Sequence, residues 1–153
     1  MALLALTIAF VAPSHLVRLD TGIAGARIQM SPSQVRRVLG APTRIRSGKW
    51  RVGYIARTYV YERRGIDVQF LLGGDRLYAY QITTRNPLDR TRRGIGVGST
   101  EAEVRHRVPD VTCIDDRYVG RYCRRPNEGG VGGTSFGIRR GRVVRVSVFA
   151  PVF

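Results

Sequence analysis

Residues 30–40 read Met-Ser-Pro-Ser-Gln-Val-Arg-Arg-Val-Leu-Gly, and residues 99–109 repeat the pattern as Ser-Thr-Glu-Ala-Glu-Val-Arg-His-Arg-Val-Pro. Each stretch opens with a hydroxyl residue suited to a helix N-cap. Gln or Glu follows three positions later, which is the spacing of a capping box. Apolar residues at i and i+4 then line one helix face before Gly40 or Pro109 ends the helix. Helices of about nine residues are unstable alone, so both must pack against other elements.

A second match follows each helix, between residues 68–82 and residues 134–148. Both stretches read as a strand, a glycine-containing turn and a second strand, with apolar residues at every other position of the second strand. The positions expected to face inward are Val144, Val146 and Val148 in the second copy and Tyr78, Tyr80 and Ile82 in the first. An earlier strand is expected over residues 53–61.

These patterns predict an α+β fold of two tandem repeats, each a short helix followed by an antiparallel β-meander of three strands. The first repeat covers residues 27–84 and the second covers residues 95–150. Asn86-Pro87 and several glycines mark the linker between them. Each repeat alone is too small for a stable core, so the two must share one. Their sheets could join edge to edge or pack face to face.

The charge of the chain is unusual for its size. Its 153 residues make one ordinary domain or two very small units, and the net charge is +15, with Lys49 as the only lysine. A strongly basic chain suits polyanionic partners such as nucleic acid, anionic lipid or acidic polysaccharide. Arginine scattered evenly over a solvated surface, as a GC-rich genome produces, is the alternative explanation.

The N-terminus and the cysteines both indicate export. Residues 1–16 resemble a signal peptide, because the apolar run is too short to span a membrane. A buried first strand or helix is the alternative. Cys113 and Cys123, ten positions apart, are expected to form one disulfide worth about 3 kcal/mol, with a redox pair as the alternative. We therefore expect a secreted or cell-envelope bacterial protein without a transmembrane span.

Residues with catalytic potential are few. His106 lies between arginines, and no nucleophile with an oriented base accompanies it. Asp115-Asp116 is more typical of a solvated loop than of an acid–base pair or a calcium site. The glycine-rich residues 129–133 lack the lysine of a phosphate-binding loop. We therefore expect no enzyme activity, no catalytic residues, no metal and no cofactor, although an unrecognised hydrolase stays as a weak alternative.

Arginine pairs followed by glycine occur at three expected turns or loops, and aromatic residues occur on the first strand. Arginine presents a planar fork that matches carboxylate and phosphate groups, and tyrosine with arginine is typical of binding hot spots. Tyr59 and Tyr61 share one strand face, which could point to solvent or to the core. The expected partner-binding residues are Arg63, Arg64, Arg139, Arg140, Tyr59 and Tyr61.

The repeated motifs resemble the SmpA/OmlA superfamily of small envelope proteins, and their tandem form resembles the β-lactamase inhibitory protein fold. The residues that carry the resemblance are Met30-Ser31, Val35, residues 39–42 and 70–82, and then residues 98–100, Val104, Val108-Pro109 and residues 136–148. The resemblance implies a partner-binding role. It does not extend to β-lactamase inhibition, because the inhibitors present an acidic hairpin loop where residues 63–65 are Arg-Arg-Gly.

Together these features predict a non-enzymatic protein-binding module, an inhibitor or adaptor that acts through its sheet face and arginine-rich turns. Its partner is expected to be a protein, of an identity that the sequence does not give. The alternative is an electrostatic binder of cell-surface polyanions or nucleic acid. Salt separates these hypotheses, because counterion-driven binding collapses as salt rises and a packed interface with aromatic anchors survives.

Overall fold

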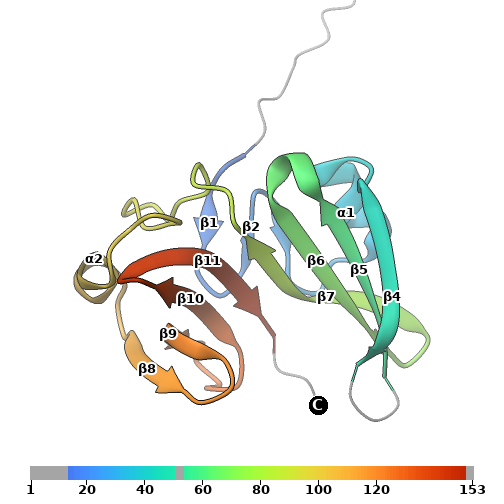
Figure 1. Cartoon of the computed structure of the whole chain (residues 1–153). Helices are drawn as coiled ribbons and strands as arrows, with labels where there is room; N and C mark the ends of the chain where they lie inside the picture. The colour runs from blue at the N-terminus through green and yellow to red at the C-terminus, as the bar shows by residue number, and fades with distance from the viewer. Residues whose placement is uncertain (1–13, 51–53, 151–153) are drawn as a thin grey trace, which may run out of the picture.

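A computed structural model describes residues 14–50 and 54–150. Its main element is an eight-stranded antiparallel sheet with the order β4-β5-β6-β7-β11-β10-β9-β8 (Figure 1). The strands of this sheet are β4 (Arg44–Trp50), β5 (Tyr54–Tyr61), β6 (Ile66–Gly73), β7 (Arg76–Thr84), β8 (Thr112–Asp116), β9 (Gly120–Pro126), β10 (Gly133–Arg139) and β11 (Arg142–Phe149). The other elements are α1 (Pro32–Leu39), α2 (Glu101–Arg107), the 3-10 helix η1 (Glu62–Arg64), and a small sheet of β1 (Val17–Arg18), β2 (Gly22–Ile23) and β3 (Ala26–Arg27).

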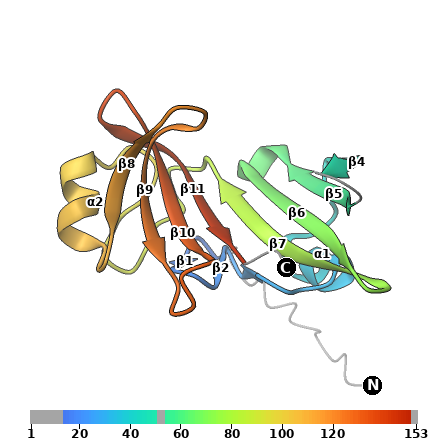
Figure 2. The same ribbon diagram turned by 90° about the horizontal axis from the view of Figure 1, so that it is seen from below.

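The two halves of the large sheet join edge to edge at β7 and β11. Thr84 lies opposite Val146 and Gln81 lies opposite Phe149 in this antiparallel pair. The pairing satisfies backbone N–H and C=O groups that each half would otherwise leave on an open edge. Figure 2 shows the two halves side by side along this junction. Of the two arrangements considered, the two halves therefore join edge to edge and do not pack face to face.

The expected α+β fold of two helix-plus-meander repeats is wrong. Strands dominate the described chain, its two α-helices have only eight and seven residues, and its strands form one continuous sheet and one small sheet. β4 and β8, the two strands at the outer edges of the large sheet, were not predicted. The β4 sequence Arg-Ile-Arg-Ser-Gly-Lys-Trp lacks apolar alternation, which a half-solvated edge strand does not need.

Both helix predictions are confirmed. Ser31 and Gln34 form a complete capping box at the start of α1, and Thr100 and Glu103 form one at the start of α2. The buried apolar residues of the helices join one core with the small sheet and one face of the large sheet. The helices contribute Val35, Leu39, Val104 and Val108 to this core, and the large sheet contributes Phe70 and Phe136 among others.

The strand faces were predicted only in part, because both hairpins contain a β-bulge. The bulge in β10–β11 leaves Val144 without a partner, so Val143 is buried while Val144 is 41% exposed. The bulge in β6–β7 falls at Tyr80, so Ala79 rather than Tyr80 pairs with the core residue Phe70, and Tyr78 is only half-buried. Each extra residue reverses the alternation on one side of it. The residues buried as expected are Tyr80, Ile82, Val146 and Val148.

The N-terminal residues 14–16 belong to the folded chain, and the apolar run over residues 2–13 lies outside the described residues. His15 Nδ1 lies 2.9 Å from the buried carboxylate of Asp89, and Leu16 forms a bridge with Arg90. Val17, in β1, belongs to the core. Within the described residues, no helix is both long and apolar enough to cross a membrane.

Candidate partner-binding surface

The face of the large sheet that points away from the helices carries mainly polar side chains. Along β6 and β7, Asp67 pairs with Thr83 and Gln69 pairs with Gln81, and these positions alternate with the core residue Val68. A hollow of about 430 Å³ lies over this face. We call it the sheet hollow, and it is lined by Asp67, Gln69, Gln81, Thr83, Arg85, Val119, Ser135, Arg145, Ser147 and Phe149.

The floor of the sheet hollow is a hydrogen-bonded polar layer across β6, β7 and β11. The hydroxyl oxygens of Thr83 and Ser147 lie 2.9 Å apart across the central strand pair. Tyr80 donates its phenolic hydrogen to Gln69 Oε1 at 2.8 Å, and burial raises the pKa of Tyr80. Because these groups already satisfy one another, the floor is rigid before any partner arrives.

The rim of the sheet hollow adds charge and one aromatic ring. Arg85 donates to the Asp67 carboxylate from both terminal nitrogens, at 3.1 and 3.2 Å. Arg145 is exposed, and the Arg124 guanidinium lies 5.3 Å from the centre of the Phe149 ring. Arginine and aromatic residues, both present on this rim, are enriched at protein interfaces.

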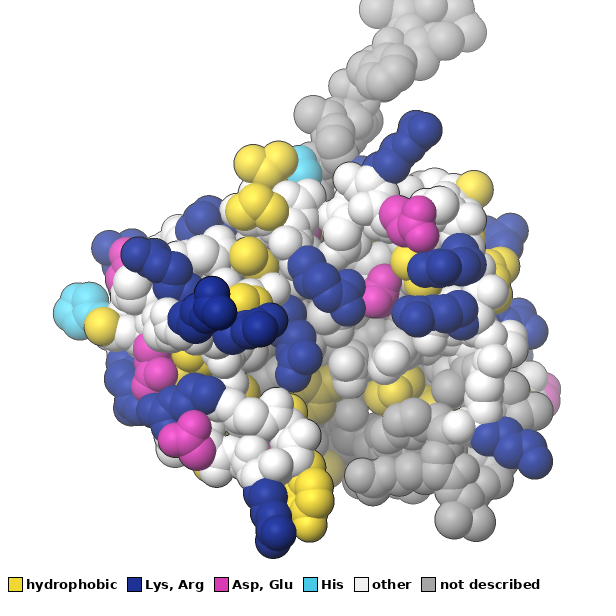
Figure 3. Space-filling view, viewed as in Figure 1, with side chains coloured by type: hydrophobic (Ala, Val, Ile, Leu, Met, Phe, Trp, Pro, Cys, Tyr) yellow, Lys and Arg dark blue, Asp and Glu magenta, His cyan; other side chains and the backbone are white. Residues whose placement is uncertain are grey.

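The β8–β9 hairpin presents the most exposed aromatic residue in the described chain beside this hollow. Tyr118, at the hairpin tip, is 89% exposed, and its neighbour Val119, which lines the sheet hollow, is 58% exposed. Figure 3 shows hydrophobic and basic side chains protruding where this hairpin ends. Tyrosine is common among interface hot spots, so Tyr118 is a candidate anchor for a partner.

The conformation of this tip is set by Asp116. Its carboxylate accepts hydrogen bonds from the backbone N–H groups of Tyr118 and Val119, each at 2.8 Å. These bonds hold the pKa of the Asp116 carboxyl below its usual value. Asp116 was expected to be a solvated loop residue, whereas here it forms the turn.

The base of the hairpin is held in two ways. The expected disulfide between Cys113 and Cys123 is present, and it joins directly opposite residues of β8 and β9. Glu101 of α2 binds Arg121 of β9 through two contacts, at 2.6 and 3.1 Å, and binds Arg105 at 2.8 Å. These bonds, led by those from Arg121, lower the pKa of Glu101 to about 2. The hairpin is therefore fixed to the helix and closed on itself.

Glu101 also lies within 4.8 Å of the two cysteine sulfurs, a grouping that could in principle hold a metal ion. Both sulfurs are joined in the disulfide, so neither offers a thiolate. Glu101 itself is occupied by two arginines. The group is therefore a structural link between α2 and the hairpin.

Tyr59 and Tyr61, two of the predicted partner-binding residues, are buried in the core. Each is only 3% exposed. The Tyr59 ring packs edge-on against Phe70 with the ring centres 4.8 Å apart. Tyr61 donates to the carbonyl oxygen of Gly40 at 3.3 Å, and burial raises its pKa to about 12. The open choice between solvent and core is thus answered in favour of the core, and both residues are withdrawn from the candidate surface.

The structure does not bring the four predicted arginines to one place. Arg63 and Arg64 lie in η1, which is held against the linker by the bond from Arg85 N to Gly65 O at 2.8 Å. Arg139 and Arg140 lie at the β10–β11 turn, which the bond from Glu101 N to Gly141 O at 3.0 Å holds against α2. Figure 1 shows these two turns in different halves of the molecule. Basic side chains are accordingly spread over the face in Figure 3.

No family model and no curated protein matches the chain. A search of solved structures found an extracellular protein containing an SCP domain from Bacillus anthracis str. Ames. The two share 13% sequence identity with a TM-score of 0.48, over 80% of this chain and 43% of the other chain. The present chain therefore spans less than half of that protein. Similarity at this level assigns neither a family nor a function.

Proposed function

We propose that this chain is a non-enzymatic protein-binding module that grips its partner between the sheet hollow and the tip of the β8–β9 hairpin. The observation that carries the proposal is Tyr118, an 89% exposed aromatic side chain on a hairpin that is otherwise immobilised. The disulfide, the Glu101–Arg121 bonds and the Asp116 turn all restrain this hairpin.

Rigidity is what makes the exposed tyrosine useful for binding. Ordering a flexible loop on binding costs free energy, so a loop that is already ordered binds more tightly through the same contacts. The polar floor of the sheet hollow can then supply directional hydrogen bonds around a central anchor. The net charge of +15 favours a partner whose docking face is acidic, because complementary charge speeds encounter and rejects basic proteins.

The proposal places the protein in a secreted or cell-envelope setting. The disulfide supports this location, because such bonds persist in oxidising compartments. The apolar residues 2–13 remain a proposed export segment. The resemblance to the SmpA/OmlA superfamily is likewise part of the proposal, and it rests on the residues that share its motifs.

Site-specific photo-crosslinking tests the proposal. A benzoylphenylalanine placed at Tyr118 would be compared with the same group at Leu88, a 63% exposed residue on the linker far along the chain from the hairpin. Each protein would be incubated with envelope and secreted fractions of the host and then irradiated. The expected result is one crosslinked protein at position 118 and none at position 88. Equal products at both positions would overturn the proposal.

A salt series separates this function from the polyanion alternative. Complexes would be washed at about 1 M salt, where electrostatic interactions extend only about 3 Å. A protein partner anchored by Tyr118 is expected to stay bound to the wild type and to be lost from Tyr118→Ala. Release of mixed acidic polymer at low salt, unaffected by Tyr118→Ala, would favour the polyanion alternative and overturn the proposal.

A further inference from the structure

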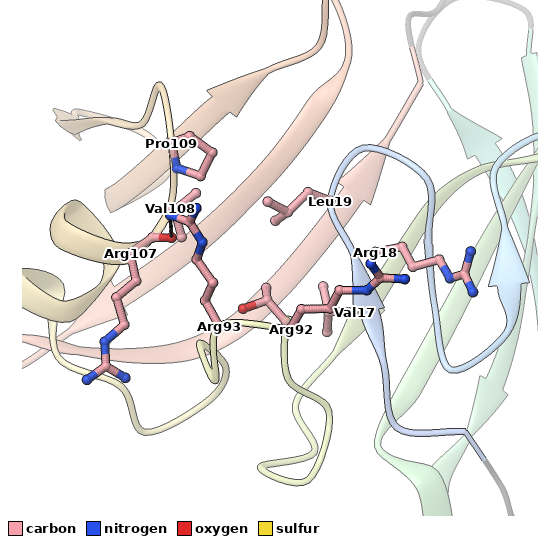
Figure 4. A pocket seen from close by; sticks show the side chains of 9 residues that line it. Val17, Arg18, Leu19, Arg92, Arg93, Arg107, Val108 and Pro109 are labelled. Atoms are coloured by element: carbon pink, nitrogen blue, oxygen red, sulfur yellow. Dashed lines mark hydrogen bonds between the residues drawn. The ribbon is translucent and has the colours of Figure 1, made fainter.

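A second cavity lies apart from the sheet hollow, between β1, the linker and the end of α2. It has a volume of about 370 Å³, within the range of small-molecule sites. Its lining residues are Val17, Arg18, Leu19, Thr91, Arg92, Arg93, Arg107, Val108 and Pro109. Figure 4 shows that they come from three separate segments of the chain. We call this cavity the basic pocket.

One part of the basic pocket is apolar. Val17 and Val108 belong to the core and are 2% and 3% exposed, and Leu19 packs against that core. Figure 4 shows Leu19 and Pro109 on opposite sides of the pocket. These side chains are fixed by β1 and by the end of α2, so they offer a preformed surface for an aliphatic group.

The remaining part is strongly basic and has no compensating acid. Four arginines line the pocket, and no acidic residue of the described chain lines it. Within residues 14–50 and 54–150, none of the four forms an ion pair, whereas six other arginines pair with carboxylates. The paired arginines are Arg44, Arg46, Arg85, Arg105, Arg121 and Arg125.

The four arginines are not equally available to a ligand. Arg107 lies close enough to Glu103 to help lower the pKa of that carboxyl, so its charge is partly compensated. Arg93 donates one hydrogen bond to the Arg107 carbonyl oxygen at 3.4 Å and keeps its other N–H groups. Figure 4 shows Arg92 reaching from the linker toward β1, the strand that carries Arg18. In Figure 4 the Arg92 and Arg93 guanidinium groups point toward different ends of the pocket, but both side chains are exposed and can turn toward a bound anion.

We propose that the basic pocket binds a small amphipathic carboxylate, a molecule with one carboxylate head and an unbranched aliphatic chain. The chain lies on Val17, Leu19, Val108 and Pro109. The head accepts hydrogen bonds from Arg92 and Arg93, whose guanidinium groups match a carboxylate in shape and charge. This site is independent of the partner-binding surface.

Titration calorimetry of the full chain with octanoate tests the proposal. Octanoate is expected to bind, while acetate, which lacks the chain, and octanamide, which lacks the charge, are expected to bind at least ten-fold more weakly. Across butanoate, hexanoate and octanoate the affinity should rise about four-fold per methylene until the pocket is filled. Equal binding of octanoate and acetate would overturn the proposal, because it would show only an exposed basic surface.

Three variants locate the ligand. Arg92→Gln and Arg93→Gln are each expected to weaken octanoate binding about ten-fold, the usual effect of losing a charged hydrogen-bond donor. Arg76→Gln is the matched control, an exposed arginine at the start of β7 that does not line the pocket, and it should bind octanoate as the wild type does. Leu19→Ala should flatten the dependence on chain length.

The results for the variants can also contradict the proposal. Wild-type affinity in the Arg92→Gln/Arg93→Gln double variant would overturn it, as would an equal loss in Arg76→Gln. Circular dichroism confirms that each variant is folded before titration. Tyr118→Ala should bind octanoate normally, so failure of one proposal is distinguishable from failure of the other.

Discussion

Removing the disulfide by the double substitution Cys113→Ala/Cys123→Ala should lower the stability of the protein and loosen its binding hairpin. The bond spans a sequence separation of 10 and joins opposite residues of β8 and β9. The loop-entropy relation for a ring of that size gives a loss of about 3 kcal/mol in the free energy of unfolding. Alanine is chosen because Cys123 is fully buried and an added hydroxyl would lack a partner there.

Equilibrium unfolding in urea measures this loss. The oxidised wild type, the wild type in reductant and the double variant would be compared, with Val131→Ala as a control at an exposed position in the next loop. The reduced wild type and the variant should both lose about 3 kcal/mol, and the control should lose almost nothing. A loss below about 1 kcal/mol in both would refute the reasoning, because the Glu101 bonds and the strand pairing would then restrain the hairpin unaided.

Three further predictions concern single side chains. Glu101→Gln should remove a stabilising effect that is complete above the usual carboxyl pKa and is lost as the pH falls toward about 2, which acid unfolding curves of the two proteins would reveal. Tyr61→Phe should remove the late step near pH 12 from an absorbance titration of the tyrosines, and an unchanged titration curve would contradict the assignment. Because the pKa of Tyr61 is raised in the folded protein, its contribution to stability is complete below about pH 10 and is lost as the pH rises toward 12. Phe136→Ala should cost about 3–5 kcal/mol in urea unfolding, because the ring is fully buried; a loss under about 1 kcal/mol would show that the core collapses around the gap.

Local sequence was sufficient to predict the helices. A capping box involves residues only three positions apart, so Ser31 with Gln34 and Thr100 with Glu103 are readable without knowing the rest of the fold. The hairpin turns at Gly73-Gly74 and Gly141 were predictable for the same reason. In each case, the interaction that defines the element lies within the element.

Edge strands and bulges depend on what lies beside them. β4 and β8 each have a neighbour on one side only, and their polar sequences carry no alternation that would identify them. The bulge at Val144 is set by the pairing of two strands rather than by its own sequence, which alternates regularly through that point. For this reason the number of strands and the buried faces of the bulged strands were predicted wrongly, although both helices were predicted correctly.

The candidate site was hard to predict because exposure is a property of the fold. Tyr59, Tyr61 and Tyr118 have the same chemistry. The first two point into the core from β5, whereas the third is exposed at the turn that Asp116 forms. The only sequence signal for the hairpin tip was an aspartate four positions before Gly120, which suits a turn. The arginine pairs do fall at connections between strands, in η1 and at the β10–β11 turn, but their separation follows from the order of the strands.

The positions of the arginines, more than their number, distinguish a functional role from a bias in composition. A genome that favours arginine codons spreads the residue over the surface, and exposed arginines then meet carboxylates only by chance. Two of the paired arginines here instead fasten elements together: Arg121 of β9 binds Glu101 of α2, and Arg125 of β9 meets Asp20 of the N-terminal segment. The basic pocket shows the opposite pattern, because arginines from three segments of the chain line an apolar floor and no acidic residue of the described chain lines it. The net positive charge around this floor therefore favours a bound anion.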